Sequence, residues 1–154
     1  MNASDIKSTM AGAFRVFATR DALKIGELMA EDVEWHGPDG NATAIYLGRA
    51  LPMKGRKTVA EFLATGFRQM FGEAEITVTA ITADADRAVV EQRLEAKLPN
   101  GGRYVNDYCF VYEFKDGKIW RMREYMDTLF GWRQVFGVNS VALPNTDACP
   151  RHPR

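Results

Sequence analysis

The chain has 154 residues, 46% of them hydrophobic and 26% charged, and its 20 Lys and Arg balance its 20 Asp and Glu. This length can bury a core without metal or disulfide staples, and the balanced charge argues against nucleic acid, an anionic membrane surface or another polyanion as partner. Weak self-repulsion leaves association through an apolar face unopposed, so we expect a homodimer.

The cysteines and the first residues bear on the compartment. Cys109 and Cys149 lie far apart and outside any CxxC or Cys/His cluster, which predicts free thiols in a reducing compartment. Residues 1–14 mix acids and bases and lack the apolar run of a signal peptide, and no stretch approaches membrane-spanning length. We therefore expect a cytoplasmic protein.

Two helices are predicted at the start of the chain. Apolar residues at helical spacing predict an amphipathic helix of about three turns behind a Ser4 cap. Its buried stripe is expected to be Ile6, Met10, Ala13, Phe14 and Phe17. A second, shorter helix is expected from Asp21, with its own apolar stripe.

The next segment changes character. Residues 32–36 alternate like a strand and stop at the turn formers of 37–40. Residues 37–57 are expected to be irregular, apart from a short strand at 44–47.

A third helix follows, because Thr58 and Glu61 have the spacing of a capping box. One face of this helix carries Val59, Phe62, Leu63, Gly66, Phe67 and Met70. Gly72 is expected to end the helix.

After Gly72 the apolar period changes from 3.6 to 2 residues, which predicts strands. They are expected at about 75–83, 88–98, 103–114 and 118–127, separated by Asp84-Ala85-Asp86, Asn100-Gly101 and Lys115-Asp116-Gly117. A short helix over 129–136 follows under an Asp127 or Thr128 cap. Helices before a curled antiparallel meander predict one α+β domain over residues 1–138, with an irregular Pro-containing tail at 139–154.

Turn lengths predict which strand residues are opposite each other. A two-residue Asn100-Gly101 turn sets Tyr108 opposite Arg93, and a three-residue second loop sets Tyr108 opposite Glu124. One sheet face is then expected to carry Glu91, Arg93, Glu95, Asn106, Tyr108, Phe110, Met122, Glu124 and Met126. A two-residue second loop would flip the last strand and replace Glu124 by Tyr125 and Asp127.

The opposite face is expected to be flat and mixed enough for a subunit interface. It would carry Val90, Leu94, Ala96, Val105, Cys109 and Val111, with Arg121, Arg123 and Tyr125 at its far side.

The row Arg93, Tyr108 and Glu124 is the predicted centre of a site. Two flanking methionines desolvate Glu124 and raise its pKa, while a nearby arginine lowers it, and such competing shifts suit a general acid or base. Tyr108 and Asn106 can orient a carbonyl, a hydroxyl or a water. An ordinary cross-strand ion pair between Arg93 and Glu124 is the alternative.

Three segments together resemble the SnoaL-like proteins of the nuclear transport factor 2-like superfamily: the helix after Gly55-Arg56, the hairpin NGGRYVNDY, and the closing run DGKIWRMREYMDT. That group includes ketosteroid-isomerase-related proteins, polyketide cyclases and limonene-epoxide hydrolases. The resemblance spans about residues 8–130 and implies a curved sheet wrapped round helices into a cone, a deep apolar pocket and a dimer across the outer face.

The epoxide-hydrolase branch uses a carboxylate, an arginine and a second carboxylate round a water, with a tyrosine and an asparagine. The resemblance matches Glu124 to the last-strand carboxylate, Arg93 to the arginine between Glu91 and Glu95, and Tyr46 to the tyrosine. Two departures stand against it, since Glu124 is longer than the expected aspartate and Gly48 stands in place of the asparagine.

The ketosteroid-isomerase branch uses a tyrosine and a protonated acid as an oxyanion hole opposite a carboxylate base. Tyr108 and Glu124 would supply the hole, and Asp39 or His36 the base. A histidine at a strand end is alternatively structural. His152 lies in the tail and the chain has no HxxxH or HxH pattern, so no metal site is expected.

Further residues have two interpretations each. Asp127 is catalytic if the last strand flips, and otherwise caps the following helix. The aromatic and Met side chains either line the pocket or belong to plain core. They are Trp35, Phe62, Phe67, Met70, Trp120 and Trp132.

Two functions follow from these residues. The first is a cofactor-independent hydrolase, isomerase or cyclase that acts on a small apolar substrate, with Glu124 as acid or base and Arg93, Tyr108 and Asn106 as polarising and orienting groups. The second is a non-catalytic module that binds a small apolar ligand or serves dimerisation.

Overall fold

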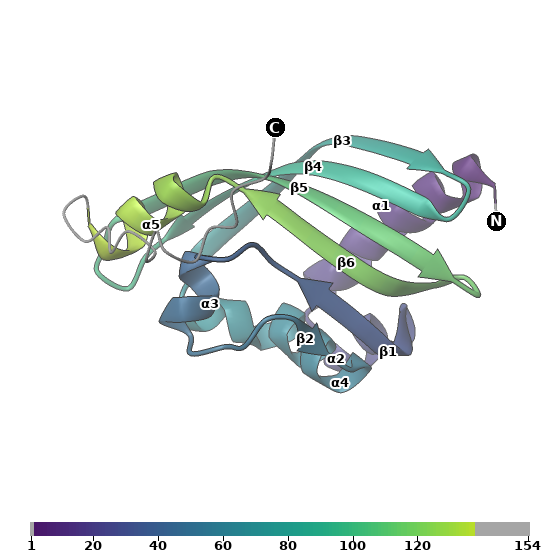
Figure 1. The fold of residues 1–154 in the computed structure, drawn as a ribbon, viewed down its shortest axis with the longest axis horizontal. Coiled ribbons are helices and arrows are strands. Elements are labelled where there is room, and N and C mark those ends of the chain that lie inside the picture. The colour runs from purple at the N-terminus through teal and green to yellow at the C-terminus, as the bar shows by residue number, and fades with distance from the viewer. Residues whose placement is uncertain (1, 138–154) are drawn as a thin grey trace, which may run out of the picture.

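The computed structural model describes residues 2–137, and its elements form an α+β fold (Figure 1). The N-terminal half contains α1 (Ala3–Thr19), α2 (Ala22–Glu27), β1 (Met29–His36), α3 (Ala42–Tyr46), β2 (Met53–Lys54), α4 (Arg56–Glu61), the π-helical turn η1 (Phe62–Gly66) and the 3₁₀ turn η2 (Phe67–Gln69). The C-terminal half contains β3 (Gly72–Asp84), β4 (Arg87–Lys97), β5 (Arg103–Lys115), β6 (Lys118–Met126) and α5 (Thr128–Phe136). The tail predicted at 139–154, with Cys149 and His152, lies outside the described residues.

The strands form one sheet in the order β2-β1-β6-β5-β4-β3. The predicted antiparallel meander of β3 to β6 is confirmed, and β1 extends it by pairing in parallel with β6. In Figure 1, α1 passes behind the strands, α2 and α4 lie beside β1 and β2, and α5 lies where β6 ends. None of the helices over residues 2–137 is long and apolar enough to cross a membrane.

The predicted apolar stripe of the first helix is confirmed, while its predicted cap is wrong. Ile6, Met10 and Ala13 are fully buried, and Phe14 and Phe17 pack against the core. Asn2, not Ser4, caps α1, because Asn2 and Asp5 exchange hydrogen bonds between side chain and backbone in a capping box. The helix expected from Asp21 is α2, with Asp21 as its N-cap, and of the two caps considered for the last helix, Asp127 is the one that caps α5.

Two predictions between β1 and β3 are wrong. The segment expected as a strand at 44–47 forms α3, because the Asn41 side chain accepts a hydrogen bond from the Ala44 N–H and starts a helix. The third helix is present, but it begins after Gly55, so Thr58 lies inside it and caps nothing. It continues through η1 and η2, and such π turns are frequent at functional sites.

The predicted face of β4 is wrong. Arg93 is opposite Asp107 and Gln92 is opposite Tyr108, one residue away from the predicted register. The last pair of the β4–β5 ladder is Lys97 with Arg103, so a five-residue loop replaces the two-residue turn. The inner face of β4 therefore carries Ala88, Val90, Gln92, Leu94 and Ala96, and Glu91, Arg93 and Glu95 lie on the outer face.

The inner face predicted for β6 is correct, although its turn is not. The loop is the two-residue Asp116-Gly117, with both residues at positive φ as a type I′ turn requires. A bulge then places one extra residue, Trp120, between the pairs Phe114–Ile119 and Glu113–Arg121. This extra residue returns Glu124 to the inner face, opposite Phe110 rather than Tyr108.

Candidate active site

A cavity of about 340 Å³ lies between the inner face of the sheet and the helices. Small-molecule sites have volumes of about 300–1,000 Å³ and are mostly apolar. The walls come from α1, β1, the 41–53 segment, η1, η2 and the strands β3 to β6. Their aromatic members are Phe14, Phe17, Trp35, Phe62, Phe67, Phe71, Tyr108, Phe110 and Tyr112.

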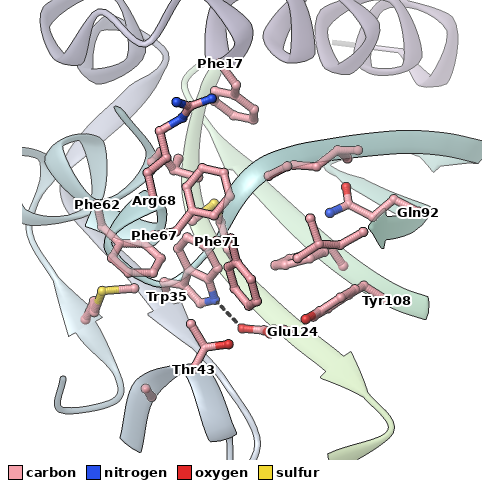
Figure 2. A pocket seen from close by; sticks show the side chains of 18 of the residues that line it. Phe17, Trp35, Thr43, Phe62, Phe67, Arg68, Phe71, Gln92, Tyr108 and Glu124 are labelled. Carbon is pink, nitrogen blue, oxygen red and sulfur yellow. Dashed lines mark hydrogen bonds between the residues drawn. The ribbon is translucent and has the colours of Figure 1, made fainter. Parts of the chain in front are cut away.

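Glu124 is the carboxylate that faces this cavity, and its side chain is held by two donors. The Trp35 Nε1–H donates to Oε2 over 3.0 Å, and the Asn41 Nδ2–H donates to Oε1 over 3.2 Å. Only 8% of Glu124 is exposed. Figure 2 shows Glu124 and Thr43 at one end of the pocket, with Phe17 and Arg68 at the other.

Burial sets the protonation behaviour of Glu124. Desolvation raises its pKa to about 7, and the hydrogen bonds from Trp35 and Asn41 act in the opposite direction. Each oxygen accepts one protein hydrogen bond, so each retains a lone pair for another partner. A carboxyl group with a pKa near neutrality can both accept and donate a proton at physiological pH.

A chain of polar side chains leads from β5 to the cavity. The Asn106 Nδ2–H donates to the Tyr104 hydroxyl over 3.3 Å, and the two hydroxyls of Tyr104 and Tyr108 are 2.8 Å apart. Burial raises the pKa of the Tyr108 phenol well above its usual value, so the group stays neutral. If Tyr104 donates to Tyr108, the Tyr108 O–H is free to donate into the cavity.

Local structure explains why Asn41 reaches Glu124. Its Oδ1 caps α3 by accepting from Ala44 N–H, which turns the amide nitrogen toward the carboxylate. Gly37, at the end of β1, leaves the room for this contact. A Cβ at that position would lie 2.8 Å from Leu51 Cδ1 and 3.3 Å from both Asn41 Nδ2 and Glu124 Oε2.

Gln92 is a second polar group on the cavity wall. Its side chain is 9% exposed, and its Oε1 has no hydrogen-bond partner among the described residues. Buried polar atoms are rarely left unpaired. This oxygen is itself shielded from the cavity, so it remains an unpaired acceptor in the wall behind the Gln92 side chain.

The sequence-predicted row is only partly assembled. Glu124 and Tyr108 both line the cavity. Arg93 does not, because it lies on the outer face and makes a two-point ion pair with Asp107, at 2.8 and 3.1 Å. Glu95 is also on the outer face, paired with Arg103. The inward placement of these two residues is wrong, for the register reason given above.

The residues predicted to bind substrate divide in the same way. Trp35, Phe67, Phe110 and Met122 line the cavity. Four others do not: Met70 is core, half-buried Met126 contacts the Asn41 amide, Asn106 donates to Tyr104 and the Asp127 carbonyl, and exposed Tyr46 packs on Phe136.

Two further candidates have structural partners. The Asp127 side chain accepts from the Phe130 N–H and caps α5. His36 contacts the Glu34 carboxylate at 2.8 Å, and neither residue lines the cavity. Within residues 2–137, no group of three or more His, Cys, Asp and Glu is arranged to hold a metal ion.

Sequence reasoning missed Asn41, Gln92 and the arginines of the cavity wall. Gln92 was detectable, because it is the polar member of an otherwise apolar alternating set on β4. Asn41 was not, because only the fold brings it to a glutamate 83 positions later.

The family follows from the sequence as a whole. The SnoaL-like domain model matches residues 11–122. This chain belongs to the SnoaL-like domain family. No curated protein matches it in sequence.

Solved structures agree on the fold of this SnoaL-like protein. An NTF2-like protein of unknown function from Burkholderia pseudomallei has a TM-score of 0.71 at 20% identity, over 84% of this chain and 95% of its own. TerC, co-crystallised with polyporic acid, has a TM-score of 0.67 at 26% identity, over 79% and 91%. An LEH-like epoxide hydrolase from M. tuberculosis has a TM-score of 0.66 at 16% identity, over 86% and 90%. The predicted cone-like fold is thus confirmed, and the neighbours include both enzymes and proteins of unknown function.

Proposed function

We propose that this protein is a cofactor-independent isomerase or cyclase that moves a proton on a small, largely apolar carbonyl compound bound in the cavity. The observation that carries the proposal is Glu124, a carboxyl group with a pKa of about 7, held by two donors at one end of an apolar pocket. General bases work best when their pKa lies near the operating pH.

The reaction needs one base and one hydrogen-bond donor. Ionised Glu124 removes a proton from the carbon next to the substrate carbonyl, and the electron pair moves onto the carbonyl oxygen as an enolate. The same carboxyl group then returns the proton to a different carbon of a conjugated enolate, or the enolate attacks a second carbonyl within the molecule, closes a ring, and leaves an alkoxide that takes the proton back from Glu124. The proton balances in both cases, so no oxidant or reductant is required.

Tyr108 is the proposed donor to the enolate oxygen. A neutral phenol in a buried site stabilises developing negative charge without becoming charged itself. The hydrogen bond from Asn106 to Tyr104 supports this role, because it favours donation from Tyr104 to Tyr108 and leaves the Tyr108 proton for the substrate.

Epoxide hydrolysis fits less well. The resemblance implied an arginine and a second carboxylate beside the first, but Arg93 pairs with Asp107 on the outer face. Among the described residues that line the cavity, Glu124 is the one carboxylate. The likeness to the M. tuberculosis epoxide hydrolase concerns the fold alone, whereas the co-crystal of TerC with polyporic acid supports a small organic molecule as the ligand.

Exchange of the protons next to a carbonyl tests the proposal without knowledge of the true substrate. The probes are 2-tetralone and 5-androstene-3,17-dione in deuterated buffer, followed by proton NMR. We expect the wild-type protein to accelerate deuterium uptake, with a rate that rises with pH through about 7 as Glu124 ionises. Exchange by the Glu124→Gln variant should be about 10²–10⁴-fold slower than by the wild type, which is the usual contribution of a general base.

A Tyr108→Phe variant keeps the ring and removes the donor, so its rate should fall while ketone binding persists. If Glu124→Gln binds the ketones and exchanges them as fast as the wild type, Glu124 is not the base. If the wild type binds both ketones and exchanges neither, the non-catalytic binding module becomes the better description.

A further inference from the structure

Three arginines from separate parts of the chain line the cavity: Arg20 at the end of α1, Arg49 after α3 and Arg68 in η2. The Arg49 guanidinium lies over the Phe62 ring, 5.6 Å from its centre. A Cβ at Gly66, the residue before η2, would lie 3.5 Å from Arg49 Nη2. Arg49 therefore reaches the turn that carries Arg68.

The other two arginines are associated with Phe17. In Figure 2 Arg68 lies near the Phe17 ring, at the end of the pocket away from Glu124. Arg20 follows Phe17 by three residues, and its backbone N–H donates to the Phe17 carbonyl over 3.1 Å at the C-cap of α1. Arg20 and Arg68 are exposed and Arg49 is half-buried, as expected for cations at the mouth of a pocket.

These arginines differ from those of the outer sheet face. Arg93, Arg103 and Arg123 each contact a carboxylate there. Over residues 2–137, Arg20, Arg49 and Arg68 have no carboxylate within 4.0 Å. Glu124 forms no ion pair with any of the three, and Figure 2 shows Arg68 at the end of the pocket away from it.

Cations on the low-dielectric wall of a cavity concentrate positive potential inside it. The guanidinium group also matches a carboxylate or a similar anion with two parallel hydrogen bonds. The nearby wall is aromatic, with Phe14, Phe17, Phe67 and Phe71. One end of the pocket thus offers cations beside flat apolar surface, and the other offers Glu124.

We propose that the ligand of this pocket is an amphipathic organic anion, with an aromatic or alicyclic body on the phenylalanine wall and an acidic group at Arg20, Arg49 and Arg68. This inference rests on the proposed function in one respect: the end of the ligand that lies away from the arginines is the end that carries the reacting carbonyl and reaches Glu124. It narrows the substrate class from apolar carbonyl compounds to those that also carry an acidic group.

A pair of fluorescent probes isolates the contribution of the charge. 8-Anilino-1-naphthalenesulfonate is an aromatic anion, and N-phenyl-1-naphthylamine is the same molecule without the sulfonate. The double variant Arg49→Gln/Arg68→Gln should weaken binding of the anion by about tenfold or more, the usual effect of losing a charge-assisted hydrogen bond. Its affinity for the neutral probe should stay within about twofold, since the apolar wall is unchanged.

Arg15→Gln is the matched control for Arg68→Gln alone, because Arg15 is an exposed arginine of α1 that does not line the cavity, and each substitution removes one positive charge. It should leave both affinities unchanged. Should the double variant unfold through loss of the Arg49–Phe62 contact, the single variant Arg68→Gln, at an exposed position, provides the same comparison. Affinity of the wild type for the anion should also fall as salt is added.

The proposal is overturned if both probes weaken equally, if Arg15→Gln weakens the anion as much as Arg68→Gln does, or if the wild type does not bind the anion. Neither probe has a carbonyl group, so these affinities do not depend on turnover. Arginine substitutions that leave anion binding unchanged, in a protein that does exchange ketone protons, would refute this inference alone. Selective loss of anion binding in a protein that exchanges neither ketone would refute the proposed function alone.

Discussion

The buried carboxyl group of Glu124 makes the stability of the fold depend on pH. Burial raises its pKa from 4.5 to about 7, so the folded state holds the proton more tightly than the unfolded state. The stabilisation from this group is complete below about pH 4.5 and is lost as the pH rises through about 7. We expect the free energy of unfolding to fall by about 3 kcal/mol across this window from Glu124 alone.

Urea denaturation of the wild type and of Glu124→Gln at several pH values measures this contribution of Glu124 to the free energy of unfolding. Glutamine has nearly the same shape and is neutral at every pH, so the difference in unfolding free energy between the two proteins isolates the carboxyl group. Glu124→Gln should gain stability relative to the wild type as the pH rises. A difference that is constant from acid to alkaline pH would show that Glu124 titrates normally.

At the same scale, only part of the site could be predicted from the sequence. The inward position of Glu124 was predictable, because β6 alternates and methionines flank the glutamate. The two groups that hold it were not assigned. Asn41 lies in a segment with no periodicity, and Trp35 reaches Glu124 only because β1 pairs in parallel with β6, a long-range pairing that no local pattern encodes.

Among the elements, β4 follows its hydrophobic alternation and not the register that its turn length predicted. Turn length was used to set the register, and it turned Glu91, Arg93 and Glu95 inward. The strand itself alternates cleanly, with Val90, Gln92 and Leu94 buried and the charged residues between them exposed. Burying three charges costs far more free energy than ordering three extra loop residues, so the hydrophobic pattern outweighs the turn signal.

Gly37 directly follows β1 and lies in a tightly packed site. Gly37→Ala should destabilise the fold by about 1–3 kcal/mol, because the new methyl group would lie 2.8 Å from Leu51 Cδ1 in a packed site. It should also slow proton exchange, since the same methyl group meets Asn41 and Glu124 at 3.3 Å. Thermal unfolding and the exchange assay measure the two effects.

Gly12→Ala is the control for this variant. Gly12 lies in α1, where the nearest atom to an added Cβ is Arg15 Nη2 at 3.7 Å, so the methyl group has room. Removing a helical glycine should stabilise the protein by about 0.5–1 kcal/mol. If Gly37→Ala behaves like Gly12→Ala, Leu51 moves aside easily and the close packing around Glu124 has been overestimated.

For the whole molecule, the order of helices and strands outside residues 37–57 followed from the sequence, because each of those elements has a clear period and clear ends. The six-stranded sheet did not, because β2 is only two residues long and β1 joins the meander through β6. The outer face also differs from the expectation. Val90, Leu94 and Ala96 were assigned to it, but they are buried on the inside, which leaves that face more charged.

We still propose that two chains associate through the outer face of β4 to β6. Val105, Cys109 and Val111 are only partly buried there, and 52% of Tyr125 is exposed. The surrounding ion pairs, such as Arg93 with Asp107, offer both charges on one face, as a twofold self-complementary contact requires. Light scattering after size-exclusion chromatography should give twice the mass of one chain for the wild type.

Val111→Glu places a new carboxylate in the middle of this face and should shift the protein to the mass of one chain, because two like charges would meet across the twofold axis. Leu23→Glu is the matched control, since Leu23 is 83% exposed on α2, which is not part of the outer face of β4 to β6. That variant should keep the mass of the wild type. If both variants leave the mass unchanged, the pairing surface is elsewhere, and a wild-type protein that already has the mass of one chain would contradict pairing altogether. Circular dichroism of Val111→Glu separates dissociation from unfolding, because a folded single chain retains the helix and sheet signal that an unfolded one loses.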